Sequence, residues 1–255
     1  MPEHERSSDR TPVDMSQIPA VSVRRLSDEV AARIRLFIVE QNLQEGTRLP
    51  SERALADIIG TSRPTVSQAL RTLSLMGLVE VRRGAGAFVL RRPDRTISLS
   101  VNLMLELDHD KVDHLVALRL WLETIGVREA VENGTDDDIR TAREALDRLR
   151  RSVGSTSTWI AADTIFHATI VGLSGNPFLT SIYEGVHTTL MGHEFQPWVE
   201  NNAVPAWLEP SQAEPQMAIH APIVEAIERR DAEAAAEAVR RHNDAMREHL
   251  EDRGR

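Results

Sequence analysis

The chain has 255 residues, of which 41% are hydrophobic and 27% charged, with a net charge of −9, as in a soluble globular protein of one or two domains. It contains no cysteine, which excludes disulfides, thiolate metal sites and cysteine nucleophiles. No apolar run approaches the roughly eighteen residues of a membrane span, and the polar N-terminus lacks a signal-peptide core, so we expect a cytoplasmic protein.

Charge divides the chain into two parts. Residues 1–92 carry 14 Lys and Arg against 11 Asp and Glu, whereas residues 93–255 carry 16 against 28. Six arginines and a single acid, Glu80, lie between residues 61 and 92. The distribution indicates a small basic module followed by a larger acidic one, and a basic module can attract nucleic acid.

The first elements in chain order are a polar tail and two helices. Residues 1–20 are predicted to be disordered. A helix is predicted from Ser27 to about Leu43. After a turn, "PSERALADIIG" predicts a short helix that Ser51 caps and Gly60 ends. The residues expected to face inward are Val30, Ile34, Phe37 and Ile38 in the first helix and Leu55, Ile58 and Ile59 in the second.

A third helix and a hairpin complete this module. "TSRPTVSQALRTLSLMG" predicts a helix with Ser62 as cap and Pro64 in its first turn. "LVEVRRGAGAFVL" alternates apolar and polar residues on either side of a glycine-rich tip and predicts a two-stranded hairpin. Three helices and a hairpin, with a tight turn at Gly60, describe a winged helix-turn-helix over residues 21–92.

The outward positions of the third helix suit DNA recognition. Arginine can bind guanine bidentately, glutamine can read adenine, and small hydroxyls reach phosphates. The second helix of such a pair presents its N-terminal residues to the major groove. A solvated face on a protein-binding module is the alternative. The outward residues of the helix are Arg63, Thr65, Ser67, Gln68 and Arg71, and the wing adds Arg82, Arg83, Gly84 and Gly86.

Residues 23–90 resemble the DNA-binding domain of the GntR family of bacterial transcription regulators. The shared features are the Leu-Pro-Ser-Glu-Arg start, the Ser-Arg-Pro-Thr-Val turn, the Gly-Leu-Val step and the Gly-x-Gly wing. The resemblance implies DNA contacts by Arg53, Arg63, Thr65 and the wing glycines, and Ser62 completes the predicted set. The family commonly has arginine at the position of Ser67, so its operator sequence does not carry over. We expect a homodimer on a palindromic double-stranded operator.

The rest of the chain is predicted to be an antiparallel all-α bundle of six to seven helices over residues 110–255. Residues 93–109 fit either a linker or a first helix, because "ISLSVNLMLEL" alternates like a strand but also has apolar residues at helical spacing. Six helices are predicted at about 110–133, 136–153, 157–174, 177–195, 213–229 and 232–252, with a proline-rich connector after the fourth.

Four polar residues are expected to converge in this bundle. Asp163 and His167 lie one helical turn apart among apolar residues. His220 and His242 lie at nearly equal distances from a predicted turn near 230–231, roughly 15 Å at 1.5 Å per residue, so antiparallel helices bring them to one height. One carboxylate and three imidazoles suit a divalent ion such as zinc or nickel. On the residues alone, ordinary surface histidines explain the pattern equally well.

The stretches "LRLWLE", "DTIFHATIVGLSGN" and "IHAPIVEAIERRDAEAAAEAVRRH" resemble the FCD effector-binding domain of a GntR subfamily. In its metal-containing members an Asp, a His one turn later and two later His hold a divalent ion. The resemblance therefore implies Asp163, His167, His220 and His242 as metal ligands, and a small carboxylate effector on the metal. Candidate effector contacts are Arg119 and His187, although Arg119 can instead pair with Glu123.

Together these features predict a DNA-binding transcription regulator, a repressor whose operator binding responds to a small organic acid, and not an enzyme. One alternative is a regulator for which the metal is itself the signal. A metalloenzyme is another, but no carboxylate stands in an evident position for a general base. Pyridoxal-phosphate enzymes fused to such DNA-binding domains require a longer chain and a Schiff-base lysine, and the only lysine, Lys111, has no suitable context.

Overall fold

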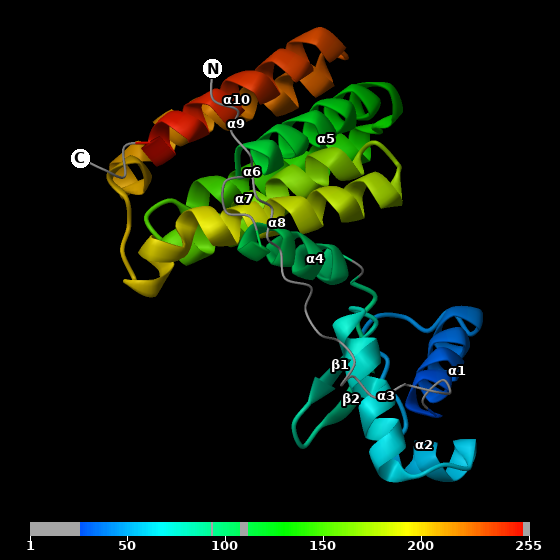
Figure 1. Cartoon of the computed structure of the whole chain (residues 1–255). Helices are drawn as coiled ribbons and strands as arrows, with labels where there is room; N and C mark the ends of the chain where they lie inside the picture. Colours follow the sequence, from blue (N-terminus) through cyan, green and yellow to red (C-terminus); the bar gives the residue numbers. More distant parts are fainter. Residues whose placement is uncertain (1–25, 93, 108–111, 252–255) are drawn as a thin grey trace, which may run out of the picture.

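The computed structural model describes residues 26–92, 94–107 and 112–251. Figure 1 shows a small N-terminal module of helices and one hairpin, a larger bundle of long helices, and helix α4 beside the bundle. The predicted tail at residues 1–20 and Lys111 lie outside the described residues. Within the described ranges, no helix combines the length and apolar character needed to cross a membrane.

The N-terminal module is the predicted winged helix-turn-helix. Its elements are α1 (Leu26–Glu40), α2 (Glu52–Ile59), α3 (Arg63–Leu75), β1 (Val79–Arg82) and β2 (Gly86–Val89). Ser51 and Ser62 cap α2 and α3 by accepting backbone N–H groups, and Gly60 ends α2 at φ +76°. The two strands are antiparallel, with Val79 opposite Val89. Local capping and turn chemistry therefore suffice to define this module.

The core of this module corrects two predicted inward positions. Phe37 is 53% exposed and Ile58 is 73% exposed, so both predictions are wrong. Each residue lies at the edge of its helix's apolar stripe, which is centred on other positions. The buried apolar side chains of the three helices are Val30, Ala31, Ile34, Ile38, Leu55, Ala56, Val66, Ala69, Leu70 and Leu73.

The segment predicted as linker or first helix is helix α4 (Asp94–Leu107). The bundle that follows consists of α5 (Val112–Asn133), α6 (Asp136–Ser152), α7 (Thr156–Gly172), α8 (Pro177–Glu200), α9 (Ala213–Glu228) and α10 (Ala232–Glu251). Two short 3-10 turns, Ala206–Leu208 and Pro210–Gln212, occupy the proline-rich connector. Helix α8 runs about one turn beyond its predicted end and includes Pro197.

Helix α7 contributes several completely buried side chains to the bundle core. Trp159, Phe166 and Ile170 on α7 are completely buried, and they belong to one apolar cluster with residues of α5, α6, α8, α9 and α10. On the same helix, Asp163 is 2% exposed and His167 is fully buried. The fold therefore places a carboxylate and an imidazole inside an apolar core, where unpaired polar groups are costly.

Helix α4 packs closely on α8 at Gly185. A Cβ added to Gly185 would lie 2.5 Å from Cγ2 of Ile97, closer than real contacts allow. Ser98 Oγ donates a hydrogen bond to the Gly185 carbonyl at 3.1 Å, and Thr189 Oγ1 donates to the Ser98 carbonyl at 3.2 Å. This close approach anchors the helix that follows the DNA-binding module to the bundle.

Replacing Gly185 by alanine should destabilise this contact. We expect Gly185→Ala to cost about 1–3 kcal/mol of unfolding free energy, because the added methyl group overpacks against Ile97. The control is Gly192→Ala on the same helix, where no atom lies within 4 Å of the added Cβ. Chemical denaturation measures both variants, and equal stabilities would contradict the close packing of α4 on α8.

Candidate functional site

Four buried side chains converge at the centre of the bundle. Asp163 and His167 come from α7, His220 from α9 and His242 from α10. One ligand atom from each lies within 4.8 Å of every other. The structure thus brings together all four residues that the sequence suggested as a group, and at most 2% of any of these side chains is exposed.

The spacing of these atoms fits ligands of one ion. His220 Nε2 lies 3.2 Å from Asp163 Oδ1 and 3.0 Å from His242 Nε2. His167 Nε2 lies 3.5 Å from the same Asp163 oxygen. Atoms that each bind a zinc ion at about 2.1 Å are separated by roughly 3.0–3.4 Å, depending on the coordination geometry.

Hydrogen bonds at the outer nitrogens orient two of the imidazoles. His220 Nδ1 lies 2.7 Å from the Gln216 carbonyl, which can only accept, so this nitrogen carries a proton. His167 Nδ1 is bonded to the Glu123 carboxylate in the same way. In the neutral form, both rings therefore present an Nε2 lone pair to the Asp163 carboxylate. The Nε2 lone pairs and the carboxylate oxygens repel one another when no proton lies between them. A cation would remove this repulsion, so these residues fit a metal ion.

The electrostatics of the cluster depend on His167. Burial opposes its protonation, but the Glu123 and Asp163 carboxylates outweigh burial and raise the pKa of His167 to about 9. Burial likewise opposes ionisation of Glu123, but His167 outweighs it and lowers the Glu123 pKa to about 2. Without an ion, a second proton on His167 therefore supplies positive charge between the two carboxylates.

The two candidate effector contacts, Arg119 and His187, also lie in this buried centre. His187 is fully buried, and its Nε2 lies 3.2 Å from Asp163 Oδ2, the carboxylate oxygen that faces away from His220. Arg119 is 3% exposed and donates to Asn243 Oδ1 at 3.2 Å. No hydrogen bond or ion pair joins Arg119 to Glu123, two described residues, and Glu123 instead bonds His167 and Tyr183. The Arg119 charge still contributes to lowering the Glu123 pKa.

Several buried polar atoms at this centre have no hydrogen-bond partner among the described residues. They are Arg119 Nε, His167 Nε2, His187 Nε2 and His242 Nδ1. Buried polar atoms are normally paired, and unpaired ones point to an ion, a ligand or water. Their concentration around Asp163 supports a polar ligand beside the four-residue cluster.

Sequence patterns do not reveal the roles of Glu123 and Tyr183. Both side chains are fully buried, and the spacing along the sequence suggests only Arg119 as a partner of Glu123. The available signal was a carboxylate in the otherwise apolar stretch "LWLETIGV", since a buried carboxylate requires a partner. The partner itself lies on another helix, and spacing along α5 does not identify it.

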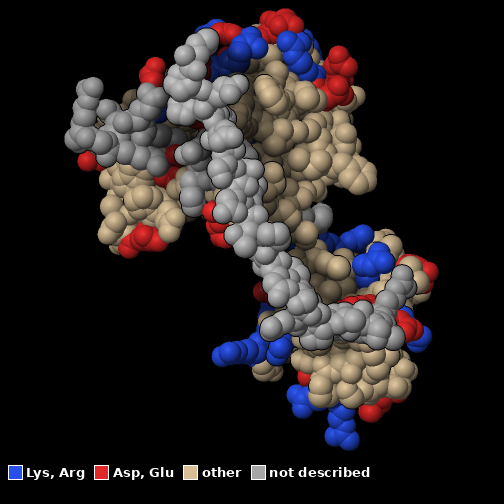
Figure 2. All heavy atoms as spheres, in the orientation of Figure 1, with Lys and Arg blue, Asp and Glu red and all other residues tan. Residues whose placement is uncertain are grey.

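The predicted DNA contacts lie on α2, α3 and the wing. Arg53, Ser62, Arg63, Gln68, Arg71, Arg82, Gly84 and Gly86 are exposed, and Thr65 and Ser67 are half-buried. Figure 2 shows cationic side chains projecting from the lower part of the molecule, where this module lies. Arg63 Nε donates to Glu52 at 2.9 Å, and Arg82 pairs with Glu80 at 2.7 Å. Both arginines must exchange these partners to reach a nucleic acid.

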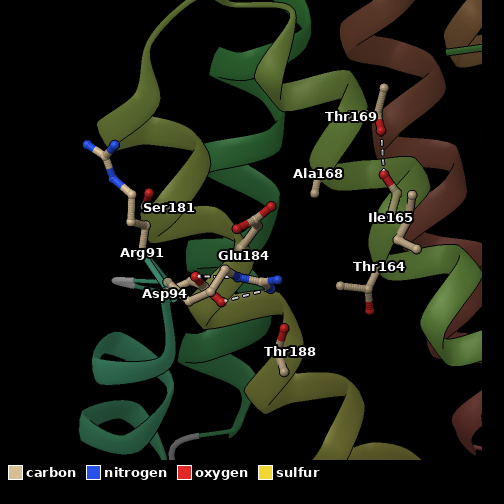
Figure 3. A pocket seen from close by; sticks show the side chains of 10 residues that line it. Arg91, Asp94, Thr164, Ile165, Ala168, Thr169, Ser181, Glu184 and Thr188 are labelled. Atoms are coloured by element: carbon tan, nitrogen blue, oxygen red, sulfur yellow. Dashed lines mark hydrogen bonds and ion pairs between the residues drawn. The ribbon is translucent and has the colours of Figure 1, made fainter. Parts of the chain in front are cut away.

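A separate cavity of about 450 Å³ is lined by Arg91, Arg92, Asp94 and residues of α7 and α8 (Figure 3). The Arg92 guanidinium pairs with Asp94 at 3.1 Å. The pKa of Glu184 is raised, mainly because the side chain is partly buried and also because the Asp94 charge is near. Hydroxyls of Thr164, Thr169, Ser181 and Thr188 also line it. Because its cations and carboxylates compensate one another, the cavity favours neither an anion nor a cation.

Comparisons with known proteins match both modules. Residues 26–89 match the bacterial regulatory proteins of the gntR family, and residues 114–251, more than half of the chain, match the FCD domain. The HTH-type transcriptional repressor NanR of Cronobacter sakazakii is 32% identical over 226 residues, covering 86% of this chain and 83% of that protein. Its namesake in Escherichia coli K12 is 31% identical over 222 residues, with 86% and 82% covered.

Solved structures show the same fold. The GntR protein of Streptococcus agalactiae superposes with a TM-score of 0.60 and 22% identity, covering 87% of this chain and 99% of that one. The E. coli protein McbR/YncC superposes with a TM-score of 0.50 and 21% identity, covering 92% and 100%. At these identities the likeness concerns the fold alone.

The raised pKa of His167 predicts a pH dependence of stability. Because the folded pKa of about 9 exceeds the usual 6.5, the stabilisation is complete below pH 6.5 and is lost as pH rises through 9. Chelator-treated protein should therefore show a falling free energy of unfolding across this range. His167→Gln should reduce the fall, whereas the exposed His114→Gln should not. A wild-type profile identical to that of His167→Gln would contradict the coupling.

Proposed function

The chain belongs to the GntR family of bacterial transcription regulators with an FCD domain, and from this membership we propose that a small organic acid bound on a divalent metal ion controls its binding to operator DNA. The chain is a DNA-binding regulator and not an enzyme. Each module has its own binding role: the winged helix-turn-helix binds DNA and the FCD domain binds the effector. We place this action in the bacterial cytoplasm.

One observation carries the proposed metal site. The Nε2 atoms of three buried imidazoles and one buried carboxylate oxygen converge, with the outer Nδ1 of two rings engaged by fixed acceptors. We propose Asp163, His167, His220 and His242 as the ligands. Nitrogen-rich sets with one carboxylate favour zinc or nickel over magnesium or calcium, which prefer oxygen ligands.

The effector should bind beside the ion. Arg119 Nε and His187 Nε2 are buried nitrogen atoms that have no hydrogen-bond partner among the described residues, and both belong to the same polar centre. A guanidinium is well suited to a carboxylate, and a bound ion supplies a Lewis-acidic site for carboxylate oxygens. We therefore propose that Arg119 and His187 contact a small carboxylate that the ion anchors.

The proposed DNA surface comprises the residues predicted from the sequence. The exposed Arg63, Gln68 and Arg71 lie on α3, and the exposed Arg82 and glycines lie at the wing. Two copies of α3 in a homodimer would read the two halves of a palindromic operator. Binding to DNA would draw Arg63 from Glu52 to a base or a phosphate.

Removing a ligand should separate metal-dependent control from DNA binding. We expect His220→Ala and His242→Ala to lose most of the bound metal, to melt at a lower temperature and to lose the response to carboxylates. Both should still bind operator DNA, because the N-terminal module has its own apolar core. Elemental analysis of tag-free protein measures the metal, and His193→Ala, an exposed histidine on α8, is the control.

The absence of metal binding by the wild-type protein would contradict the proposed metal site. Wild-type protein with less than about a tenth of an equivalent of metal, and with no uptake of zinc or nickel on titration, would exclude the site at the affinities expected of such ligands. The four side chains would then form a polar network held by the protonated His167.

Substituting Arg63 tests the DNA surface. If Arg63 reads a base, Arg63→Ala should cost roughly 1–3 kcal/mol on the correct operator and relax specificity at one position. An equal loss on all sequences would assign Arg63 to a phosphate. Competition binding with an operator library measures both effects, and Arg140→Ala, an exposed arginine on α6, is the control. Unchanged affinity on every sequence would remove Arg63 from the interface.

A further inference from the structure

Glu123 has a position that the proposed metal ligands do not explain. It is a completely buried carboxylate on α5, yet it does not belong to the four-residue group. Its Oε1 is bonded to His167 Nδ1, the ring nitrogen that faces away from Asp163. Glu123 therefore contacts the proposed metal site only indirectly, through the ligand His167.

A second set of contacts extends from Glu123 to the other side of Asp163. Tyr183, on α8, donates its hydroxyl to Glu123 Oε2 at 3.1 Å. The same hydroxyl lies 3.3 Å from His187 Nδ1, and the two rings are stacked with an interplanar angle of 21°. His187 Nε2 in turn lies 3.2 Å from Asp163 Oδ2. The contacts thus form a closed circuit through Glu123, Tyr183, His187, Asp163 and His167.

The number of protons in this circuit is limited. A tyrosine hydroxyl has one proton, and Tyr183 gives it to the Glu123 carboxylate. The hydroxyl oxygen can then only accept from His187, so His187 Nδ1 must carry a proton. His167 Nδ1 carries one as well, because its partner is the carboxylate of Glu123. One carboxylate therefore determines the protonated nitrogen of two histidines.

We propose that Glu123 is a positioning residue for the metal centre, which holds His167 directly and His187 through the hydroxyl of Tyr183, so that both rings turn Nε2 toward Asp163. The proposal rests on the metal site of the proposed function and adds a residue outside the ligand set. It also gives the two histidines different tasks: His167 Nε2 faces the shared Asp163 oxygen Oδ1, and His187 Nε2 faces Oδ2.

The expected size of the effect follows from the chemistry of imidazole. A histidine binds a metal through a nitrogen that has no proton, and a carboxylate on the other nitrogen fixes that tautomer and makes the ligand more basic. Loss of such a partner typically costs about 10–100-fold in metal affinity. A buried residue with a merely structural role would change stability without changing the protonated nitrogen of either ring.

Two near-isosteric variants separate the parts of the circuit. Glu123→Gln removes the charge that faces His167, and Tyr183→Phe removes only the connection to His187. Glu129→Gln, an exposed carboxylate on the same helix that bonds Asn133, is the matched control. Competition with a chelator measures zinc affinity, and ¹⁵N-edited NMR of the histidine rings reports which nitrogen carries the proton.

The proposal predicts a different result for each variant. Glu123→Gln should bind zinc about 10–100-fold more weakly than wild type. Tyr183→Phe should bind zinc nearly as tightly as wild type, but His187 should no longer be held with its proton on Nδ1. Zinc binding by Glu123→Gln at wild-type affinity would overturn the proposal, as would a wild-type His187 protonated only on Nε2.

The same experiment distinguishes this proposal from the metal site itself. If wild-type protein takes up no zinc, the proposed function fails. The ring spectra of zinc-free wild type and Tyr183→Phe still decide the circuit, which predicts Nδ1 protonation of His187 in the first and its release in the second. Identical His187 spectra in the two proteins would contradict the circuit.

Discussion

The structure of the bundle depends on one buried charge, the carboxylate of Asp163. A carboxylate 2% exposed in an apolar core must be compensated, and imidazoles on α7, α8 and α9 lie within 3.5 Å of it, while His242 on α10 contacts the His220 imidazole. These contacts join the four helices at one point in the bundle. Several buried nitrogens that lack a hydrogen-bond partner within the described ranges also lie here, which makes the centre of the bundle suited to an ion and an acidic ligand.

The two modules have separate cores, and helix α4 connects them. Helix α4 lies against α8 at Gly185. Two residues further along α8, His187 enters the polar centre. The cavity of Figure 3 lies beside the same helices, with Glu184 and Thr188 in its wall. Helix α8 is thus in contact with both the polar centre and the helix that follows the DNA-binding module, a physical arrangement on which ligand control can act.

Local sequence patterns were sufficient to predict most elements, because caps and helix breakers such as Ser51, Gly60 and Ser62 act within a few residues. They also suggested the group around Asp163, since one pair is a helical turn apart and the other is equidistant from a turn. The partners of Glu123 and Arg119 could not be predicted in this way. Tyr183 and Asn243 lie on other helices, and the rotation and tilt of packed helices decide such contacts. The pattern of residues 97–107 fits both a strand and a helix. The sequence does not distinguish them, because the contact of this segment with α8 is not visible in local spacing.

The central claim is that an ion in the bundle anchors an acid and that the acid, not the ion alone, controls DNA binding. Fluorescence anisotropy of labelled operator DNA tests it directly, with zinc-loaded and chelator-treated protein titrated with a panel of small carboxylates. The account predicts that at least one acid changes operator affinity when zinc is present, that the same acid has no effect after chelation, and that chelation alone leaves the affinity unchanged. Operator affinity that responds to chelation but to no acid would contradict it and would identify the ion itself as the signal.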